Sequence, residues 1–279
     1  MSEQAFFFSN RNGERLFAFE HLVESASDIG VVFCAPFGEE KSRAYRVLAK
    51  FARYLSERGI PSLRFDSKGS GDSEGDMVDM TVDSLVEDTC DAISLLKART
   101  KVKRVVLIGL RFGATVAALT AERDERVNSL VLLSPILRGA HYWRELLRMK
   151  QFASIWLQQA AKKSSEYKQI LERDGRLEIE AQFVSKVFAE QIQQINLLKQ
   201  TPSFKGDLLV TALAKDSLAC ELAAKVIEHY AEGNSQVLWT EEERDYWSVL
   251  SLFDQYHPIP TFDYTYQWLT GDDRAALSA

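Results

Sequence analysis

Cysteine is scarce in this sequence, and its placement excludes several classes of protein. The 279 residues include three cysteines, Cys34, Cys90 and Cys220, which lie far apart and show no paired spacing. This pattern is typical neither of a disulfide framework nor of a zinc-binding or redox motif. A chain of this length builds a core that needs no such support. We therefore expect three reduced core thiols, no metal and no cofactor.

Long apolar runs and a basic leader are also missing. The chain begins with the acidic and polar residues Ser2, Glu3 and Gln4, whereas a signal peptide begins with basic and then apolar residues. The longest apolar stretches, such as 105–110, are far shorter than the roughly 20 residues that span a bilayer. The sequence therefore predicts a soluble, cytoplasmic protein with no membrane span.

Positive charge is in deficit overall but not locally. The net charge of −6 argues against nucleic acid as a partner of the whole surface. Residues 138–199 nevertheless contain 11 Lys and Arg against 7 Asp and Glu, so this stretch carries +4 and the remainder −10. Two interpretations stay open: a solvated helical insertion, or a basic lid over an anionic ligand.

Strands and helices are predicted to alternate along most of the chain. Short apolar runs and helical spacing of apolar residues indicate strands at 31–34, 61–66, 105–108, 130–133, 208–211 and 236–239, and helices at 42–58, 79–98, 113–121, 218–230 and within 262–269. Strands that are apolar throughout favour an α/β fold with a mostly parallel sheet and helices on both faces.

The alternation stops between about 139 and 200, where the sequence shows helical periodicity only. We therefore predict a core made of residues 1–138 and 201–279, and a helical lid insertion at 139–200. A lid in this place would cover the carboxyl ends of the strands, where ligands bind in open α/β sheets.

The most informative motif is the segment 104–115, which reads as a strand, a sharp turn and a helix. Gly109 and Gly113 lie two residues on either side of Arg111. A side chain at either glycine would collide with the neighbouring strand or helix if the turn is tight. The spacing predicts an elbow that holds Arg111 in a strained conformation.

Together with this elbow, three further motifs make the chain resemble the α/β-hydrolase superfamily, of the serine aminopeptidase and esterase type. Residues 35–38 resemble its oxyanion loop, 64–75 resemble its glycine-rich turn, and 209–216 resemble the strand that delivers the acid of the triad. More narrowly, 36–40 together with 109–111 resemble the hydrolase-like proteins that accompany exosortase systems. The resemblance implies an α/β-hydrolase fold with a helical lid.

Arg111 stands where the resemblance implies the nucleophilic serine. A guanidinium stays protonated and offers donors only, so it does not attack a carbonyl. Leu110 and Phe112 flank it, so no serine or cysteine is adjacent. Ser70 and Ser73 lie on a neighbouring predicted turn, but nothing in the sequence positions a base beside them. The sequence thus predicts a degenerate catalytic triad, and a pseudoenzyme is the leading interpretation.

Two residues are candidates for the remaining catalytic positions. Asp216 matches the acid of the triad, although capping of the helix that follows it explains its position equally well. The base should follow the strand at 236–239, and the next stretch contains no histidine; His257, in a proline-rich loop, is the later candidate. His21, His141 and His229 lie elsewhere and are expected to be structural.

A ligand site is predicted at the elbow. Arg111 and Phe112 begin a helix whose free N–H groups favour negative charge, and Phe37 and Gly38 would add donors from the oxyanion loop. The guanidinium fork suits carboxylate or phosphate. In the alternative, Arg111 pairs with a carboxylate of the chain, namely Glu39, Glu40 or Asp216, and fills a dead site.

Three functions remain compatible with these residues. The first is a non-catalytic protein that binds an anionic small molecule, or an acyl or glycan-type ligand, between core and lid. The second is a hydrolase or acyltransferase with rearranged catalytic residues, using Asp216 with His257 or a water. The third is an interaction protein of a polysaccharide or sorting pathway, a context that only the resemblance implies.

Overall fold

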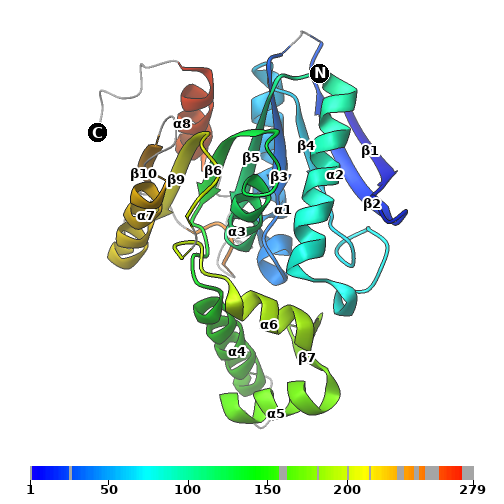
Figure 1. Ribbon diagram of the computed structural model, residues 1–279, viewed down its shortest axis with the longest axis vertical. Helices are drawn as coiled ribbons and strands as arrows, with labels where there is room; N and C mark the ends of the chain where they lie inside the picture. The colour runs from blue at the N-terminus through cyan, green and yellow to red at the C-terminus, as the bar shows by residue number, and fades with distance from the viewer. Residues whose placement is uncertain are drawn as a thin grey trace.

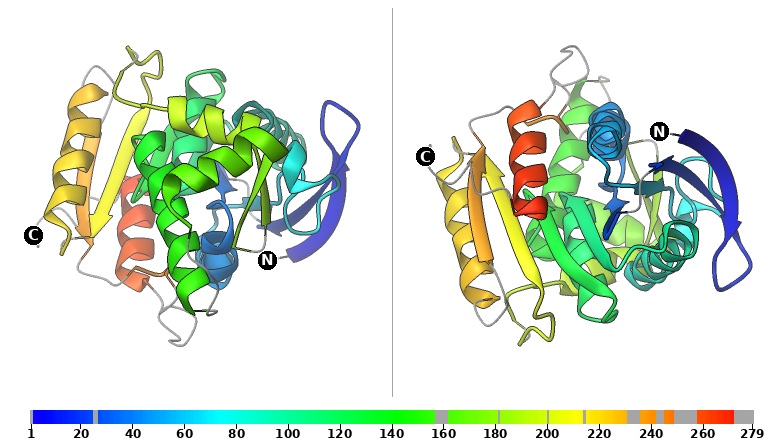
Figure 2. Two further views of the ribbon diagram at one scale, coloured as in Figure 1. Left: turned by 90° about the horizontal axis from the view of Figure 1, so that it is seen from below. Right: turned by 90° about the horizontal axis from the view of Figure 1, so that it is seen from above.

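The computed structural model describes residues 2–24, 27–156, 162–180, 182–199, 201–213, 215–230, 236–241, 245–248 and 258–271. Over these residues a central sheet carries helices on both faces, and a further group of elements lies beyond one end of the sheet (Figure 1). Figure 2 shows the same ribbon from below and from above, each turned by 90° from the view of Figure 1.

The central sheet has eight strands within the described residues, in the order β1-β2-β4-β3-β5-β6-β9-β10. Its strands are β1 (Ser2–Ser9), β2 (Arg15–Leu22), β3 (Ile29–Cys34), β4 (Ser62–Phe65), β5 (Arg104–Leu110), β6 (Val127–Leu133), β9 (Asp207–Leu213) and β10 (Gln236–Glu241). The six strands from β4 to β10 run parallel, which confirms the prediction from their continuous apolar runs. The antiparallel pair β1 and β2 extends this sheet at one edge.

Five of the described helices cover the two faces of the sheet. One face packs against α1 (Glu39–Glu57) and α8 (Ile259–Thr270), and the other against α2 (Val82–Thr100), α3 (Phe112–Ala121) and α7 (Ser217–His229). Phe51 of α1 stacks on Phe262 of α8 with ring centroids 4.2 Å apart. A short 3-10 turn, η1 (Met77–Asp79), precedes α2. Both faces of the parallel strands are therefore buried, as the all-apolar strands require.

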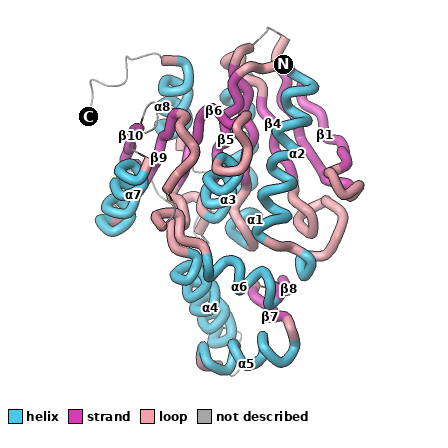
Figure 3. Tube along the Cα trace, viewed as in Figure 1, coloured by secondary structure: helices cyan, strands magenta, loops and turns pink. Residues whose placement is uncertain are grey.

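The residues between β6 and β9, which we call the β6–β9 segment, form the group beyond the sheet (Figure 3). The segment contains α4 (Gly139–Trp156), α5 (Ser164–Asp174), β7 (Arg176–Ile179), β8 (Gln182–Ser185) and α6 (Lys186–Gln194). Its apolar side chains form one cluster with Phe37 and Phe112 of the core. Within this segment, α4 and α6 pack against each other.

The prediction of helical structure throughout 139–200 was wrong at one place. β7 and β8 pair as an antiparallel hairpin, with Leu177 and Ile179 buried alternately with exposed neighbours. Glu180 makes the turn with a positive φ of 49°. The buried Val184 of β8 is followed closely by apolar residues of α6, so a period of two in a four-residue strand was indistinguishable from part of a helical stripe.

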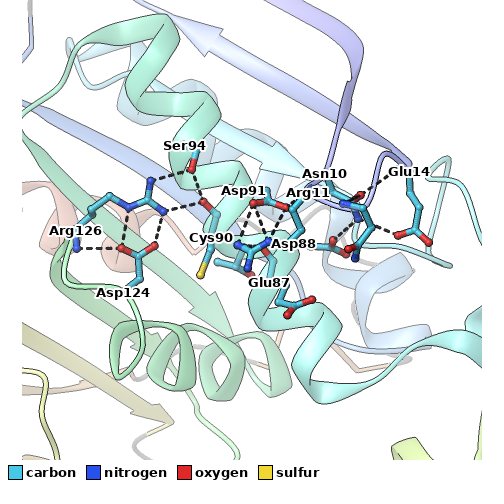
Figure 4. A network of polar contacts seen from close by, with 12 residues as sticks. Asn10, Arg11, Glu14, Glu87, Asp88, Cys90, Asp91, Ser94, Asp124 and Arg126 are labelled. Atoms are coloured by element: carbon cyan, nitrogen blue, oxygen red, sulfur yellow. Dashed lines mark hydrogen bonds and ion pairs between the residues drawn. The ribbon is translucent and has the colours of Figure 1, made fainter.

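A polar network attaches the β1–β2 turn to α2 (Figure 4). The side-chain amide of Asn10 donates to Asp88 Oδ1 at 3.0 Å, and the backbone N–H of Lys68 donates to Asp88 Oδ2 at 2.8 Å. Arg11 pairs with Asp91 on the same helix. Burial raises the pKa of the Asp88 carboxyl, while its two donors oppose that rise. The edge hairpin is thus held by a buried carboxylate as well as by strand pairing.

Among the described helices, none combines the length and the apolar composition that crossing a bilayer requires. Of the three cysteines, all unpaired, Cys34 is buried while Cys90 and Cys220 are half-buried. Burial raises the pKa of the Cys34 thiol to about 12 and that of Cys90 to about 11, which keeps both thiols protonated and unreactive at neutral pH.

We expect Asn10→Ala to destabilise the fold by about 2 kcal/mol. The substitution removes a hydrogen-bond donor from the Asp88 carboxylate, and Asp88 is only 2% exposed. Urea unfolding followed by tryptophan fluorescence measures the change. Asn12→Ala is the matched control, since that side chain is exposed and its loss should cost less than about 0.5 kcal/mol. Equal effects of the two variants would contradict a role for the Asn10–Asp88 contact.

Candidate functional site

The turn between β5 and α3 is a strained elbow with Arg111 at its tip. Arg111 has φ 53° and ψ −119°, a conformation that residues with a side chain adopt at a cost of about 1–3 kcal/mol. A Cβ on Gly109 would lie 2.4 Å from Ala114 Cα, and one on Gly113 would lie 2.2 Å from the carbonyl oxygen of Cys34. Both contacts are with backbone, so the predicted need for two glycines is confirmed.

The Arg111 side chain is held by two carboxylates and a tryptophan. Its Nε donates to Glu40 Oε1 at 3.0 Å, and its Nη2 donates to Glu145 Oε1 at 3.1 Å. Its guanidinium carbon lies 5.6 Å from the ring centroid of Trp247. Glu40, one of the three carboxylates considered from the sequence, is therefore a partner, and Glu145 of α4 is a second partner that the sequence did not indicate.

Glu40 is the more buried of the two carboxylates. It sits in the first turn of α1, where the helix dipole favours a negative charge. Its Oε2 atom has no hydrogen-bond partner among the described residues. Burial raises the pKa of Glu40, and the neighbouring Arg111 guanidinium opposes that rise. The pair thus depends on mutual compensation, because each group alone would be a buried charge.

A cavity of about 690 Å³ lies next to the elbow, between the core and the hairpin of the β6–β9 segment. Three predicted ligand residues, Phe37, Gly38 and Phe112, line it, whereas Arg111 is not among its lining residues. Phe37 and Phe112 are themselves buried, and their ring centroids are 6.2 Å apart. They form an apolar wall that belongs to the core rather than a flexible contact surface.

On another wall of this cavity, Lys41 joins two polar groups of the glycine-rich turn. Lys41 Nζ lies 2.6 Å from Asp66 Oδ1 and donates to Ser70 Oγ at 2.7 Å. The Asp72 backbone N–H donates to Asp66 Oδ2 at 3.1 Å. These contacts use two of the three N–H donors of the Lys41 ammonium, and the Ser70 oxygen serves as an acceptor. One N–H of Lys41 and the O–H of Ser70 can therefore donate to a ligand.

Sequence reasoning considered Ser70 but found no group to act on it. The missing partner is Lys41, which lies in the first turn of α1. Lys41 follows Phe37 by four residues and lines the same cavity. Its closeness in sequence to the predicted oxyanion loop was the signal that could have identified it. In this arrangement Lys41 acts as a hydrogen-bond donor, because its Nζ pairs with Asp66 and donates to the Ser70 hydroxyl oxygen.

The charges around the large cavity do not favour an anion. Its described lining residues include one cation, Lys41, and three acids, Asp66, Asp72 and Asp76. The β6–β9 segment contributes Gln182 and Phe183, and none of its basic residues appears among the described lining. Of the two interpretations of the basic stretch, a solvated surface agrees better with this cavity than a basic cover.

A second cavity, of about 280 Å³, lies on the other side of the elbow. Arg111, Glu145, His141, Ser134 and Asp216 are among its lining residues. The structure thus divides the predicted site: Arg111 and Asp216 share this cavity, whereas Phe37, Gly38 and Phe112 line the larger one.

The acid and base candidates have different outcomes. Asp216 accepts from the backbone N–H of Ala219 at 3.0 Å and so caps α7, which is the structural alternative considered for it. His257 lies outside the described residues. His21 is buried beside Glu3, and burial lowers its pKa to about 4, consistent with a structural role. His141 is exposed and lines the smaller cavity, a place that the sequence did not indicate.

The parallel sheet, the helices on both faces and the strained elbow after β5 together define an α/β-hydrolase fold, as predicted. Comparison with known families agrees with the geometry. The sequence model of the family described as serine aminopeptidase, S33 (Hydrolase_4) matches residues 27–225. The chain belongs to this family.

Solved structures of similar fold cover nearly the whole chain. The ferulic acid complex of Est1E from Butyrivibrio proteoclasticus superposes with a TM-score of 0.71 at 14% identity, over 96% of this chain and 98% of that one. The esterase Pf2001 from Pyrococcus furiosus gives a TM-score of 0.66 at 20% identity, over 96% of this chain and 90% of that one. At these identities the likeness establishes the fold alone.

Curated relatives match over a shorter stretch. Polyketide transferase grgF from a Penicillium species is 31% identical over 94 residues, which are 33% of this chain and 32% of the relative. Polyketide transferase ATR5 from Stachybotrys chlorohalonatus is 32% identical over 101 residues, which are 35% of this chain and 34% of the relative. The match spans about a third of the length of these relatives.

We expect Arg111→Met to destabilise the protein by about 3 kcal/mol at neutral pH, because Glu40 is left as a buried, uncompensated carboxylate. The double variant Glu40→Gln with Arg111→Met should be more stable than Arg111→Met alone. Urea unfolding of wild type, both single variants and the double variant measures the coupling. Arg123→Met, which removes an exposed pair with Asp83, is the control and should cost less than about 1 kcal/mol.

The same variants should differ in their pH dependence. Without Arg111, burial raises the folded-state pKa of Glu40 further above its unfolded value. The stability that comes from protonated Glu40 is then present at low pH and lost as the pH rises through the folded-state pKa. Arg111→Met should therefore lose stability relative to the double variant as the pH rises above the ordinary glutamate pKa of 4.5. If the free energies of unfolding of the two variants changed with pH in parallel, Glu40 would not be the cause of the destabilisation.

Proposed function

We propose that this chain is an α/β-hydrolase-fold protein whose nucleophile position is taken by Arg111 and whose elbow no longer performs covalent serine chemistry. We further propose that it binds a neutral small molecule of acyl or glycan type in the large cavity, with residues 139–200 serving as the lid over a core of residues 1–138 and 201–279. Arg111 would then act as a structural tie between core and lid.

The observation that carries this proposal is the enclosure of the Arg111 guanidinium by Glu40 and Glu145. One carboxylate belongs to α1 of the core and the other to α4 of the lid. A serine nucleophile must stand free beside a base, whereas this side chain is 15% exposed and already ion-paired. The internal partners also argue against Arg111 as the receptor of an anionic ligand, since an anion would have to compete with both.

The cavity lining supports a neutral ligand with hydrogen-bond acceptors. Phe37 and Phe112 supply an apolar wall, and Lys41 and Ser70 supply two donors at the opposite, polar side. Asp66 offsets the charge of Lys41, so the donors suit a carbonyl, ester or hydroxyl oxygen better than a phosphate. The printed names of similar proteins, which mention polyketide transferases and bound ferulic acid, belong to the same broad chemistry.

The narrower resemblance to exosortase-associated proteins gains a physical rationale from the same ion pair. Its two motif pieces, 36–40 and 109–111, contain Glu40 and Arg111, which pair with each other at 3.0 Å. Within this chain the two pieces depend on each other, because either residue alone leaves a buried charge. Membership of that group rests on the sequence resemblance and is part of the proposal.

A rearranged hydrolase is the second candidate. It is favoured by one observation, namely that Asp216, His141 and Ser134 line the same small cavity as Arg111. In this alternative a water, rather than a covalent serine, would attack the substrate.

An ester assay separates these two functions. We expect no hydrolysis of p-nitrophenyl butyrate by wild type above a heat-treated control, because the elbow offers no nucleophile. Arg111→Ser should also stay inactive, since His141, which shares the smaller cavity with Arg111, makes no hydrogen bond to an orienting carboxylate among the described contacts, and Asp216 caps α7 instead. Turnover by wild type that disappears in Asp216→Ala, His141→Ala or His257→Ala would overturn the proposal in favour of the rearranged hydrolase.

Ligand binding is tested with methyl ferulate as a neutral probe and ferulate as its anionic counterpart, by isothermal titration calorimetry. We expect the neutral ester to bind more tightly by about tenfold, the equivalent of about 1.4 kcal/mol, because three acids surround the single cation. Lys41→Met and Ser70→Ala should each weaken ester binding by several-fold, the effect of losing about 1 kcal/mol of hydrogen bonding.

Lys103→Met is the matched control for Lys41→Met, because Lys103 forms an exposed pair with Asp28 away from the cavity. Unchanged ester binding in Lys41→Met and Ser70→Ala, with binding intact in the control, would show that the probe binds elsewhere. Tighter binding of the ferulate anion than of the ester would instead favour the first interpretation from the sequence, in which the protein binds an anionic ligand.

A further inference from the structure

Among the basic residues of 138–199, Arg138 lines the smaller cavity, whereas Arg144 and Arg148 are exposed on α4. Arg144, Arg148, Phe152 and Ile155 are all exposed and follow one another at spacings of four, four and three residues. This spacing places them along one side of the helix. We call these four residues the α4 stripe.

In the first half of α4, the side opposite the α4 stripe is buried. Tyr142, Trp143, Leu146 and Leu147 are buried against α6 and the aromatic residues of the core. The first half of α4 is therefore anchored to the rest of the molecule, with Arg144 and Arg148 on its outward side. The second half, with Phe152 and Ile155, continues this outward surface and has no buried residue among those described.

The apolar half of the stripe is unusually open. Phe152 is 70% exposed and Ile155 is 60% exposed, on adjacent turns of the same helix. Large apolar side chains are expected to be covered, and neighbouring exposed ones mark a surface that meets an apolar phase or partner. Their placement near the end of α4 that is farther from the sheet makes them accessible to an extended surface (Figure 1).

The surroundings of this apolar pair are basic. Residues 139–168 contain six Lys and Arg against two acids, Glu145 and Glu166. Glu145 faces inward to Arg111, and Glu166 accepts from the Lys163 backbone N–H at 2.7 Å in the cap of α5. Among the described residues, no carboxylate forms an ion pair with Arg144 or Arg148, so their charges remain available.

A second pair of lysines extends the basic surface. Gln151 Nε2 donates to the carbonyl oxygen of Lys162 at 2.9 Å, which brings Lys162 and the adjacent Lys163 beside the middle of the stripe. Both lysines are exposed. Phe152 and Ile155 thus project from one end of α4. The cationic groups that flank them are those of Arg144, Arg148, Lys162 and Lys163.

We propose that the α4 stripe docks on an anionic lipid surface, with Phe152 and Ile155 inserted among the lipid chains near the headgroups and Arg144, Arg148, Lys162 and Lys163 contacting anionic headgroups. A basic helix with an apolar stripe binds in the plane of a membrane interface without crossing it. Each basic residue near an anionic surface adds attraction that salt screens. The lid thereby docks independently of what the cavity holds.

Vesicle co-sedimentation of the full chain tests the proposal. Vesicles of phosphatidylcholine and phosphatidylglycerol, in a ratio of about 3:1, are compared with phosphatidylcholine alone. We expect binding to the anionic vesicles, weak binding to the neutral ones, and loss of binding when salt is raised from about 0.05 M to about 0.5 M. Phe152→Ser with Ile155→Ser should lower the partition coefficient at least about tenfold, and Arg144→Gln with Arg148→Gln by about fivefold per charge.

Ile259→Ser is the matched control, because Ile259 is an aliphatic residue 45% exposed at the start of α8, on the core. It should bind vesicles like wild type, and circular dichroism confirms that each variant is folded. Three results would overturn the proposal: no binding to anionic vesicles, equal binding to both vesicles, or binding that survives Phe152→Ser with Ile155→Ser. Self-association of wild type that these two substitutions abolish, without vesicle binding, would identify a second copy as the partner instead.

Discussion

The burial of one guanidinium constrains the centre of this molecule. Arg111 sits at the tip of a strained elbow, and a charged group in that place must be compensated within hydrogen-bond distance. Glu40 meets it from the first turn of α1, and Glu145 meets it from α4. A single side chain therefore links the sheet, the first covering helix and the β6–β9 segment. The backbone of the elbow is that of a hydrolase, while its side chain serves as a cross-link, so fold and chemistry separate at this residue.

The same cross-link divides the space around the elbow. The larger cavity keeps the aromatic wall of Phe37 and Phe112 and the donors of Lys41 and Ser70, but not Arg111. The smaller one holds Arg111 and Asp216, and Asp216 is occupied in capping α7. The residues predicted for one ligand site are thus distributed between two compartments. The larger compartment combines an apolar wall with hydrogen-bond donors.

The β6–β9 segment has two surfaces with opposite chemistry. Its inner side is apolar and continuous with the core cluster around Phe112 and Phe188, whose ring centroids are 6.2 Å apart. Its outer side along α4 is basic and carries exposed apolar groups. The surplus of positive charge in this stretch is therefore a property of the outside of the molecule. The segment can therefore cover a cavity with its inner side and present its outer side to the proposed lipid surface. Helix periodicity keeps the two sides apart.

The sequence by itself determined what depends on neighbours along the chain. Continuous apolar runs specified the six parallel strands, and Gly109 and Gly113 specified the elbow with Arg111 at its tip, because strand period and turn sterics are local properties. Only the tertiary structure decided the partners: Glu40 is 71 residues from Arg111, Glu145 is 34 away, and Lys41 meets Ser70 across 29. Such pairs are chosen by the packing of α1, α4 and the turn after β4, and several carboxylates were compatible with the sequence. The hairpin of β7 and β8 was likewise decided by packing, since its four-residue strands are too short for their period to be read alone.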